Sequence, residues 1–583
     1  MDYLELAELY EKLGSTSKRL EKTFILSKFL KKTKTSEVNH LVNLIQGNVY
    51  SPWEEQKIGM SSRLIIKALS NVSGKGADNI DKLWAKIGDL GEVAEKLCSK
   101  KEQTTLHSST LTTRKVFDNI RKLADMEGEG TVSKKVGLLS ELLTSASPVG
   151  AKYIVRTILE ELRVGVSEGT FRDAIVWAFF DKELGIIYDE KKNKVDVNNR
   201  EEFNECVNKV KHAYDLTSDF SVVIENIKDL DSIKLVVGTP INVMLYQKVK
   251  GIKEGFDAVG KPAVLEFKYD GFRVLVHKSN GQIKLFTRRL ENVSKQFPDI
   301  VELIKNNVRG DNYILDSEVI GIDPKSKKWL PFQDISQRIK RKYDIEEIVK
   351  KVPIMLNVFD IIAYNKESLI SKPFKERRKI IESIIKPVKE RLEPAKQIIT
   401  SDIKEAEKFY KEALKKGNEG IMMKNLEGIY KPGSRVGYGV KVKPILETLD
   451  LIITGAEWGE GKRAKWLSSF ELSCLRDNKK EILAIGKVGT GIKEKDELGI
   501  SFDELTKLLK PLITDTKGKN VTIKPKIIVE IAYEEIQKST SYSSGYALRF
   551  PRLINIRYDL GVKDSKTISD VERIYNMQRG RQV

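Results

Sequence analysis

The chain has 583 residues, too many for one hydrophobic core, so several domains are expected. A net charge of +19 and an apolar fraction of 40% favour a folded protein with a polyanionic partner, nucleic acid before an anionic membrane. Surface lysines of a heat-adapted protein would give a similar charge. The three cysteines are far apart, which excludes a disulfide framework and a CxxC zinc site. The start is acidic with a helical period, and no run of 18 residues is apolar, so we expect no signal peptide, no membrane span and a cytoplasmic location.

Residues 1–215 have mostly helical periodicity. Ser147 and Pro148 indicate a new helix start. The glycine-rich turn at 163–170 precedes a predicted helix at 171–180. Amides at such a helix start can hold a phosphate, and a plain turn between helices explains the pattern equally well. The polar stretch 189–202 predicts a solvated loop.

Residues 216–447 have a mixed pattern. Two strands joined at Asn280-Gly281 form a predicted hairpin. Further strands are expected at 313–322 and 352–363, and helices near 375–392 and 402–416. Strands mixed with helices in this way predict an α+β domain.

Residues 448–583 contain short predicted strands. They lie around 450–457, 469–475, 482–487, 527–534 and 553–558. Their even spacing fits a small β-barrel, and a sandwich fits it too.

Lys268 lies at the end of an apolar run, "LEFKYDGFRVLV". A lysine amine attacks only when it is neutral, which desolvation and neighbouring cations favour. Asp270-Gly271 permits a sharp turn that would return Arg273 toward Lys268. The stretch alone is also consistent with a surface lysine at a hairpin edge.

Six further stretches follow "EFKYDGFR" in the same order as in one known family. They are "TRRLENVS", "ILDSEVIG", "NVFDII", "EGIMMK", "GVKVKP" and "SGYALRFPRLINIRYD". Together they resemble the motifs of ATP-dependent DNA ligases of the archaeal and eukaryotic type. The resemblance implies an all-α DNA-binding domain (1–215), an α+β adenylation (nucleotidyltransferase) domain (216–447) and a C-terminal OB-fold β-barrel (448–583). It also implies nick sealing in replication, repair and recombination.

The same resemblance implies a role for each motif residue. Lys268 would form a lysyl–AMP intermediate with ATP, Glu266 would bind the adenine amino group, and Phe359 would stack on the base. Glu318 would bind ribose or metal, and Glu419, with Glu318, would hold Mg²⁺, for which Mn²⁺ is an alternative. The cations expected to converge on the phosphates are Arg273, Arg288, Arg435, Lys441 and Lys443. The residues expected to bind DNA or phosphate in the C-terminal part are Arg549, Arg552, Arg557 and Asp559.

Two positions depart from the family pattern. Leu560 stands where many relatives have a lysine, for which Lys563 is a candidate substitute, and Gly439-Val440 replaces an aromatic residue. Neither touches the nucleophile, so activity is expected. An RNA ligase or capping-type nucleotidyltransferase and a non-catalytic DNA-binding scaffold remain alternatives. The expected partners are nicked duplex DNA and a sliding clamp, and we expect a nucleoid-associated monomer.

Overall fold

The computed structural model describes most of the chain, with short gaps. The described residues are 1–99, 111–126, 128–326, 328–330, 332–340, 344–433, 435–444, 447–459, 463, 465–478, 480–494 and 499–578. They form two compact units. The first comprises Met1–Tyr246, Gly271–Ala395 and Leu426–Tyr438, and the second Gln247–Asp270, Lys396–Asn425 and Gly439–Val583.

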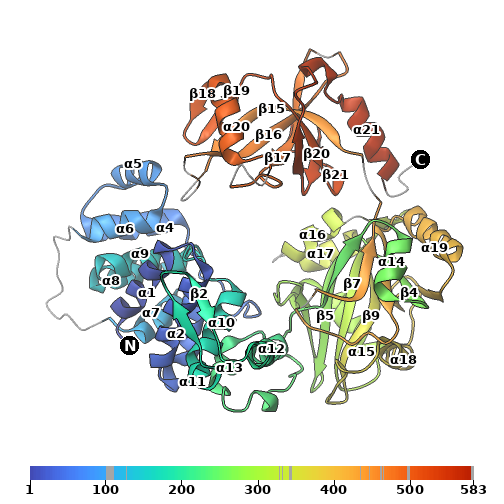
Figure 1. Ribbon diagram of the computed structural model, residues 1–583, viewed down its shortest axis with the longest axis horizontal. Helices are drawn as coiled ribbons and strands as arrows, with labels where there is room; N and C mark the ends of the chain where they lie inside the picture. The colour runs from blue at the N-terminus through green and yellow to red at the C-terminus, as the bar shows by residue number, and fades with distance from the viewer. Residues whose placement is uncertain are drawn as a thin grey trace. The chain divides into compact units, whose positions relative to one another are not determined.

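The first unit begins with a helical region (Figure 1). Its helices are α1 (Tyr3–Ser15), α2 (Arg19–Lys32), α3 (Val38–Ile45), α4 (Ser62–Ser73), α5 (Ala77–Ile87), α6 (Leu90–Cys98), α7 (Thr113–Asp125), α8 (Thr131–Ser145), α9 (Pro148–Ile158), α10 (Glu168–Phe179), α11 (Asp181–Leu184), α12 (Arg200–Thr217) and α13 (Phe220–Glu225), with short 3₁₀ turns η1 (Thr35–Glu37) and η2 (Leu230–Ser232). Hydrogen bonds from backbone amides to N-cap side chains explain where several of these helices begin. Ser147 accepts from the Gly150 amide at α9, which confirms the predicted start there. Ser167 accepts from the Thr170 amide, so α10 begins at Glu168, three residues before the predicted start.

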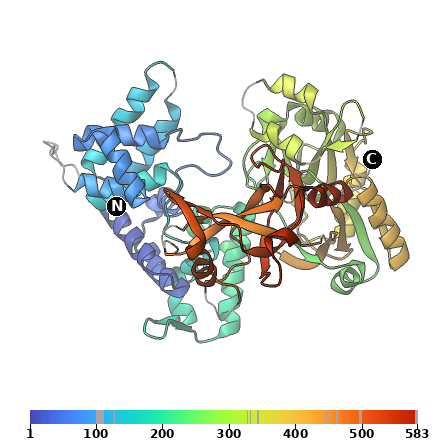
Figure 2. The ribbon, with the colours of Figure 1, turned by 90° about the horizontal axis from the view of Figure 1, so that it is seen from above.

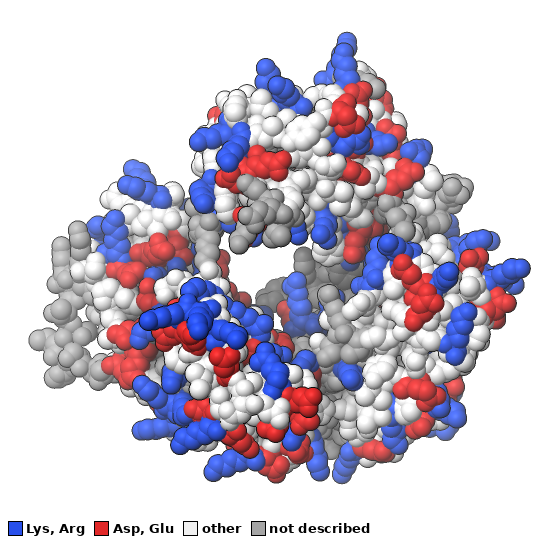
Figure 3. Space-filling model, viewed as in Figure 1, with Lys and Arg blue, Asp and Glu red and all other residues white. Residues whose placement is uncertain are grey.

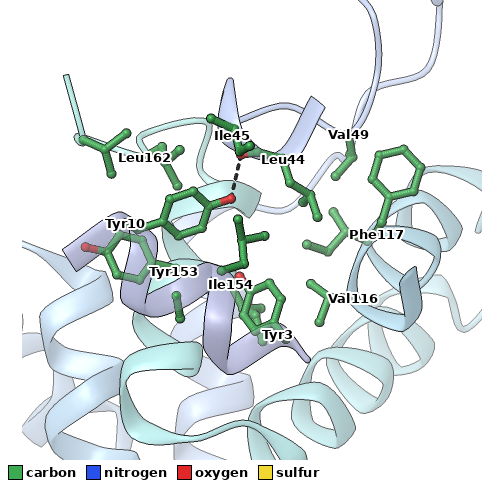
Figure 4. Packing of buried hydrophobic residues seen from close by; sticks show 14 of the residues in the cluster. Tyr3, Tyr10, Leu44, Ile45, Val49, Val116, Phe117, Tyr153, Ile154 and Leu162 are labelled. Atoms are coloured by element: carbon green, nitrogen blue, oxygen red, sulfur yellow. Dashed lines mark hydrogen bonds between the residues drawn. The ribbon is translucent and has the colours of Figure 1, made fainter. Parts of the chain in front are cut away.

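The core of this region is built from helices far apart in sequence. Tyr10 of α1 packs 4.7 Å from Tyr153 of α9, centroid to centroid, and its hydroxyl donates to the Leu44 carbonyl at 2.7 Å (Figure 4). The Phe220 ring of α13 stacks 4.8 Å from Phe171 of α10. The buried cluster therefore continues beyond residue 215 to Ile224.

The predicted loop at 189–202 is wrong in part. The segment contains β2 (Lys194–Asp196), which pairs with β1 (Ile187–Asp189) in a small hairpin. The helix α12 begins within the same segment, at Arg200. Asn193, with φ of 49°, makes the tight turn, and Asn199 caps α12. Polar composition conceals this hairpin because its strands pack only Tyr188 and Val195, both partly buried, against the helical core.

The rest of the first unit contains a seven-stranded sheet. Its central strand order is β10-β9-β7-β5-β6, β11 pairs with β9 and β8 pairs with β7. The strands are β5 (Phe272–Ser279), β6 (Gln282–Thr287), β7 (Asn312–Ile322), β8 (Trp329–Leu330), β9 (Ile354–Tyr364), β10 (Glu367–Ser368) and β11 (Leu392–Pro394), and the helical elements are η3 (Ser294–Gln296), α15 (Pro298–Asn307), α16 (Phe332–Lys340), α17 (Ile345–Lys351) and α18 (Phe374–Ile384). The hairpin at Asn280-Gly281 is confirmed. The predicted helix at 375–392 is too long, because α18 ends at Ile384 and Leu392 begins β11.

The second unit begins with a five-stranded sheet of order β12-β4-β13-β14-β3. Its strands are β3 (Leu245–Val249), β4 (Ala263–Lys268), β12 (Gln397–Thr400), β13 (Gly420–Asn425) and β14 (Arg435–Val442), and its helices are α14 (Ile252–Val259) and α19 (Ile403–Lys415). Both helices pack on this sheet, and α19 lies along its outer side in both views (Figure 1, Figure 2).

The C-terminal region is rich in strands. β15 (Leu449–Trp458), β16 (Leu467–Leu475), β17 (Ile482–Val488), β18 (Ile513–Lys517), β19 (Asn520–Ile523), β20 (Ile528–Ala532) and β23 (Arg552–Ile556) form one antiparallel sheet, and β21 (Glu535–Lys538) pairs with β22 (Tyr546–Arg549). The predicted strands near 450, 469, 482, 527 and 553 are confirmed. Sequence periodicity did not reveal β18, β19, β21, β22, nor α20 (Phe502–Leu509), η6 (Lys510–Leu512), η7 (Val562–Asp564) and α21 (Ile568–Met577). Within the described residues, none of the helices is both long and apolar enough to cross a membrane.

Candidate active site

One face of the small sheet in the second unit carries polar side chains. Glu266 and Lys268 lie two apart on β4, so both point to the same side. Met422 of β13 pairs with Glu266 and with Lys441 of β14, which brings Lys441 and Lys424 to that same face.

The opposite face of this sheet is apolar and covered. Phe267 of β4 lies 4.8 Å from the Phe409 ring of α19, centroid to centroid. Gly255 of α14 approaches Met423 so closely that an added Cβ would lie 2.3 Å from its sulfur. Burial of one face therefore fixes the strand register and holds Lys268 and its neighbours on the other.

Glu419 contacts two lysines of the polar face, Lys268 and Lys443. It precedes β13, and its backbone amide donates to the Lys268 carbonyl at 2.9 Å. Its Oε2 lies 2.6 Å from Lys268 Nζ and 2.7 Å from Lys443 Nζ. Burial alone would raise the pKa of Glu419, but the charges and hydrogen bonds of the two lysines hold it well below its ordinary value. The carboxylate is thus ionised and holds two cations together.

The C-terminal region contributes charged groups to the same cluster. Arg549 Nη1 lies 3.8 Å from Glu419 Oε1 and 3.4 Å from Glu535 Oε2. Lys443 Nζ lies 3.4 Å from Glu534 Oε2. Arg549 and Lys443, predicted for separate tasks, are therefore linked through Glu419.

Glu266 and Lys424 form a buried ion pair of 2.6 Å between Oε2 and Nζ. Both side chains are at most 3% exposed. Lys441 is half-buried, and burial followed by the charges of Lys268 and Lys443 lowers its pKa. Lysine and arginine side chains thus gather around Glu419, where they can offset the negative charge of phosphate oxygens.

The donor set near Lys268 fits a magnesium ion that is completed by substrate oxygens. Mg²⁺ usually takes one or two carboxylates and keeps water or phosphate oxygens in its other positions. Glu419 supplies an ionised carboxylate, although two lysines share it. Among the described residues, no three His, Cys, Asp or Glu side chains cluster as a ready-made protein cage.

Arg273 lies at the start of β5 in the first unit. It donates through Nε to Asp316 Oδ1 at 2.7 Å and through Nη1 to the Met244 carbonyl at 2.7 Å. Its guanidinium carbon lies 5.2 Å from the centroid of the Phe359 ring. Glu318 is the cross-strand partner of Arg273 on β7. The structure therefore brings together three predicted residues: Arg273, Glu318 and Phe359.

The other predicted cations are more dispersed. Arg288 is exposed just after β6, and the side chain of Arg435 lies outside the described residues. In the C-terminal region, Arg552 is exposed at the start of β23. Arg557 forms a bidentate pair with Asp559, at 2.9 and 2.7 Å, and also binds Asp450 at 2.9 Å.

Phe550 is an exposed aromatic residue between Arg549 and Arg552. It is 67% exposed and its φ is 50°, a left-handed conformation that is rare for a bulky residue. The local backbone therefore presents an aromatic side chain to solvent between two arginines.

The sequence interpretation assigned no role to Asp316 or Tyr430. Asp316 is fully buried and accepts a 2.7 Å hydrogen bond from the Tyr430 hydroxyl. A signal existed for Asp316, because it lies two residues before Glu318 and hence on the same face of its strand. None existed for Tyr430, which follows β13 and is over a hundred residues away.

Family models cover most of the chain. "DNA ligase N terminus" matches residues 2–176, "ATP dependent DNA ligase domain" matches 243–443, and "ATP dependent DNA ligase C terminal region" matches 463–560. The chain belongs to the ATP-dependent DNA ligase family. A DNA ligase of Nanoarchaeum equitans is 45% identical over 100% of this chain and 99% of its own length. One of Archaeoglobus fulgidus is 40% identical over 99% of both chains.

A solved structure titled "Pmar-Lig_PreS3" has a similar fold. Its TM-score is 0.57 at 16% identity, over 94% of this chain and 99% of that one. The present chain has a helical N-terminal domain, a central nucleotidyltransferase domain and a strand-rich C-terminal domain.

Proposed function

We propose that this ligase seals nicks in duplex DNA through a covalent AMP on Lys268. Lys268 Nζ attacks the α-phosphorus of ATP, the bond to pyrophosphate breaks, and a lysyl phosphoramidate forms. AMP then passes to the 5′-phosphate of the nick and releases the lysine. Finally, the 3′-hydroxyl attacks that phosphate and AMP leaves. The observation that carries this proposal is the convergence of Lys268, Lys443 and Arg549 on Glu419.

The chain's own residues supply charge and orientation for these steps. Lys441 and Lys443 lie beside Lys268 and suit the charge that develops on phosphate oxygens. The Lys268 ammonium must lose its proton before attack, which requires its pair with Glu419 to loosen as the nucleotide binds. Glu419 would hold Mg²⁺, which when bound neutralises phosphate charge, and Mn²⁺ is an alternative ion.

The nucleoside half of ATP is assigned to four residues. Glu266 binds the adenine amino group and Phe359 stacks on the ring. Arg273 binds a phosphate or sugar oxygen, and Glu318 binds the ribose hydroxyls or the metal ion. The charged residues Arg288, Arg435, Arg552, Arg557 and Asp559 are assigned to phosphate or DNA contacts.

The proposal also covers the domain boundaries, the fold of the C-terminal domain and the partners. We assign residues 1–215, 216–447 and 448–583 to DNA-binding, adenylation and OB-fold domains. The antiparallel order β17-β16-β15-β19-β18, with β20 joining β15 to β23, supports a small barrel. The proposed partners are nicked duplex DNA and a sliding clamp, and the chain acts as a monomer.

Labelled ATP tests the chemistry. Wild-type protein with α-labelled ATP and Mg²⁺ should retain label on a denaturing gel, Lys268→Ala should not, and Lys284→Ala of β6 should label normally. Equal label on wild type and Lys268→Ala would refute the mechanism. Matched nicked duplexes of DNA and RNA then decide the substrate, and faster sealing of RNA would favour the RNA-ligase alternative.

A further inference from the structure

Four residues form a closed circuit of hydrogen bonds in the first unit. Arg273 binds Asp316 through Nε and Nη2, at 2.7 and 2.5 Å, and the Met244 carbonyl through Nη1 at 2.7 Å. The Tyr430 hydroxyl donates to Asp316 Oδ2 at 2.7 Å and accepts from the Met244 amide at 3.2 Å. Asp316 and the Met244 carbonyl therefore hold the guanidinium directly, and Tyr430 holds those two partners in place.

The circuit is buried and stays charged at ordinary pH. Asp316 is 0% exposed, and Met244 and Tyr430 are 2% exposed. Burial, then the Asp316 charge, raises the pKa of Tyr430, so its hydroxyl remains a donor. Burial alone would lower the pKa of Arg273, but Asp316 raises it above its ordinary value. A buried and fully bonded polar network of this kind fixes one geometry.

The segment that carries Tyr430 is anchored a second time. Arg377 Nη1 donates to the Gly428 carbonyl at 3.1 Å, and its Nε binds Asp360 Oδ1 at 2.7 Å. Asp360 is the immediate neighbour of Phe359 on β9. The segment between β13 and β14 is therefore tied to Arg273 through one anchor and to the strand of Phe359 through the other.

We propose that Asp316 and Tyr430 are positioning residues of the adenylylation step, which fix the Arg273 guanidinium beside the Phe359 ring. This inference rests on the proposed function, in which Arg273 and Phe359 bind ATP. An arginine side chain has many rotamers, and ordering it during binding weakens affinity. A guanidinium already bonded to Asp316 and the Met244 carbonyl, both of them held in turn by Tyr430, avoids that loss. The two residues act through Arg273 and need not touch the nucleotide.

Tyr430→Phe tests the proposal with little change in shape. It removes the donor to Asp316 and leaves the Met244 amide unpaired. We expect the KM for ATP in self-adenylylation to rise about tenfold, as for the loss of a buried hydrogen bond to a charged group, with a smaller change in kcat. Asp316→Asn should raise KM more, because it removes the charge opposite Arg273. Tyr313→Phe of β7 is the control, because in the described part of the chain the buried Tyr313 hydroxyl makes no hydrogen bond.

A double-mutant cycle with Arg273→Lys separates positioning from general stability. If Tyr430 acts through Arg273, Tyr430→Phe should add less than a twofold change in KM to Arg273→Lys. Additive effects, or an unchanged KM in Tyr430→Phe, would overturn the inference. Thermal unfolding checks that each variant folds. If Tyr430→Phe does not fold, the same cycle is measured with Asp316→Asn in its place. The proposed function fails separately, when wild type itself takes no label.

Discussion

At the scale of single residues, Glu419 joins two of the lysines that the sequence motifs predict for the site, Lys268 and Lys443. It lies 151 residues from Lys268 along the chain, yet β13 pairs with β4 so that the two side chains meet at 2.6 Å. Motif reasoning named Glu419 as a metal ligand and Lys268 as a nucleophile. The direct pair between them depends on strand register, which one sequence does not specify.

Glu419→Gln should slow self-adenylylation about 10²- to 10³-fold, because a neutral amide no longer holds Lys268 and Lys443 or offers charge to a metal ion. Single-turnover labelling with α-labelled ATP measures the rate. Glu412→Gln is a matched control, because Glu412 of α19 also pairs with two lysines, Lys396 and Lys416. A similar loss in both variants would show that the effect is not specific to the site.

Phe550→Gly separates aromatic contact from backbone strain in the C-terminal region. Glycine adopts a φ of 50° without cost, so unfolding should not become easier. If the exposed ring contacts DNA, the Kd for nicked duplex should rise about tenfold, near the value of one aromatic stacking contact. Fluorescence anisotropy measures the Kd, and unchanged binding would remove Phe550 from the DNA surface.

At the scale of elements, alternation along β4 explains why part of the site was predictable. Glu266 and Lys268 alternate with the buried Leu265 and Phe267, and Phe267 packs against Phe409 of α19. The sequence therefore reveals which side chains share a face. It did not reveal the Glu266–Lys424 pair or the Arg273–Asp316 pair, because those require the order of strands in two separate sheets. Short exposed strands such as β1 and β18 were missed because they bury too little to show a pattern.

Gly420→Ala tests how β13 positions Glu419. Gly420 has φ of 143°, and an added Cβ would lie 2.1 Å from the Val442 carbonyl oxygen. We expect a loss of about 2 kcal/mol or more in the free energy of unfolding, with slower adenylylation. Gly417→Ala also places a side chain at a positive φ, 83°, but the space around its Cβ is open, so it should preserve adenylylation. Equal activity in both variants would contradict the role of close strand approach.

His277 of β5 should make the large sheet acid-sensitive. Its Nδ1 accepts from the Gly238 amide, and burial, then Lys284, lowers its pKa to about 3. Between that value and the unfolded pKa of about 6.5, the unfolded state binds more protons, so stability is present above pH 6.5 and falls as the pH falls toward 3. His277→Gln should flatten this dependence in urea unfolding between pH 4 and 7. An identical slope in both proteins would exclude His277 as the source.

At the scale of the whole molecule, DNA binding through the net positive charge can be tested separately from adenylylation. The net charge is +19, and lysine and arginine are interspersed with acidic residues on the viewed surface of the helical region (Figure 3). Phosphate contacts release counterions, so affinity for a duplex must fall as salt rises. The proposed adenylylation site is instead a partly buried cluster around Glu419, where salt screens charges less.

The two activities should therefore respond differently to salt. Between 50 and 200 mM salt, the affinity for nicked duplex should fall by roughly 10³-fold if about six phosphates are contacted, whereas self-adenylylation should change by less than about threefold. Parallel titrations with one preparation measure both, and the slope of log K against log salt gives the number of contacts. Equal losses would mean that salt acts on the nucleotide site. A flat DNA response would mean that the excess of lysine and arginine serves something other than the DNA backbone.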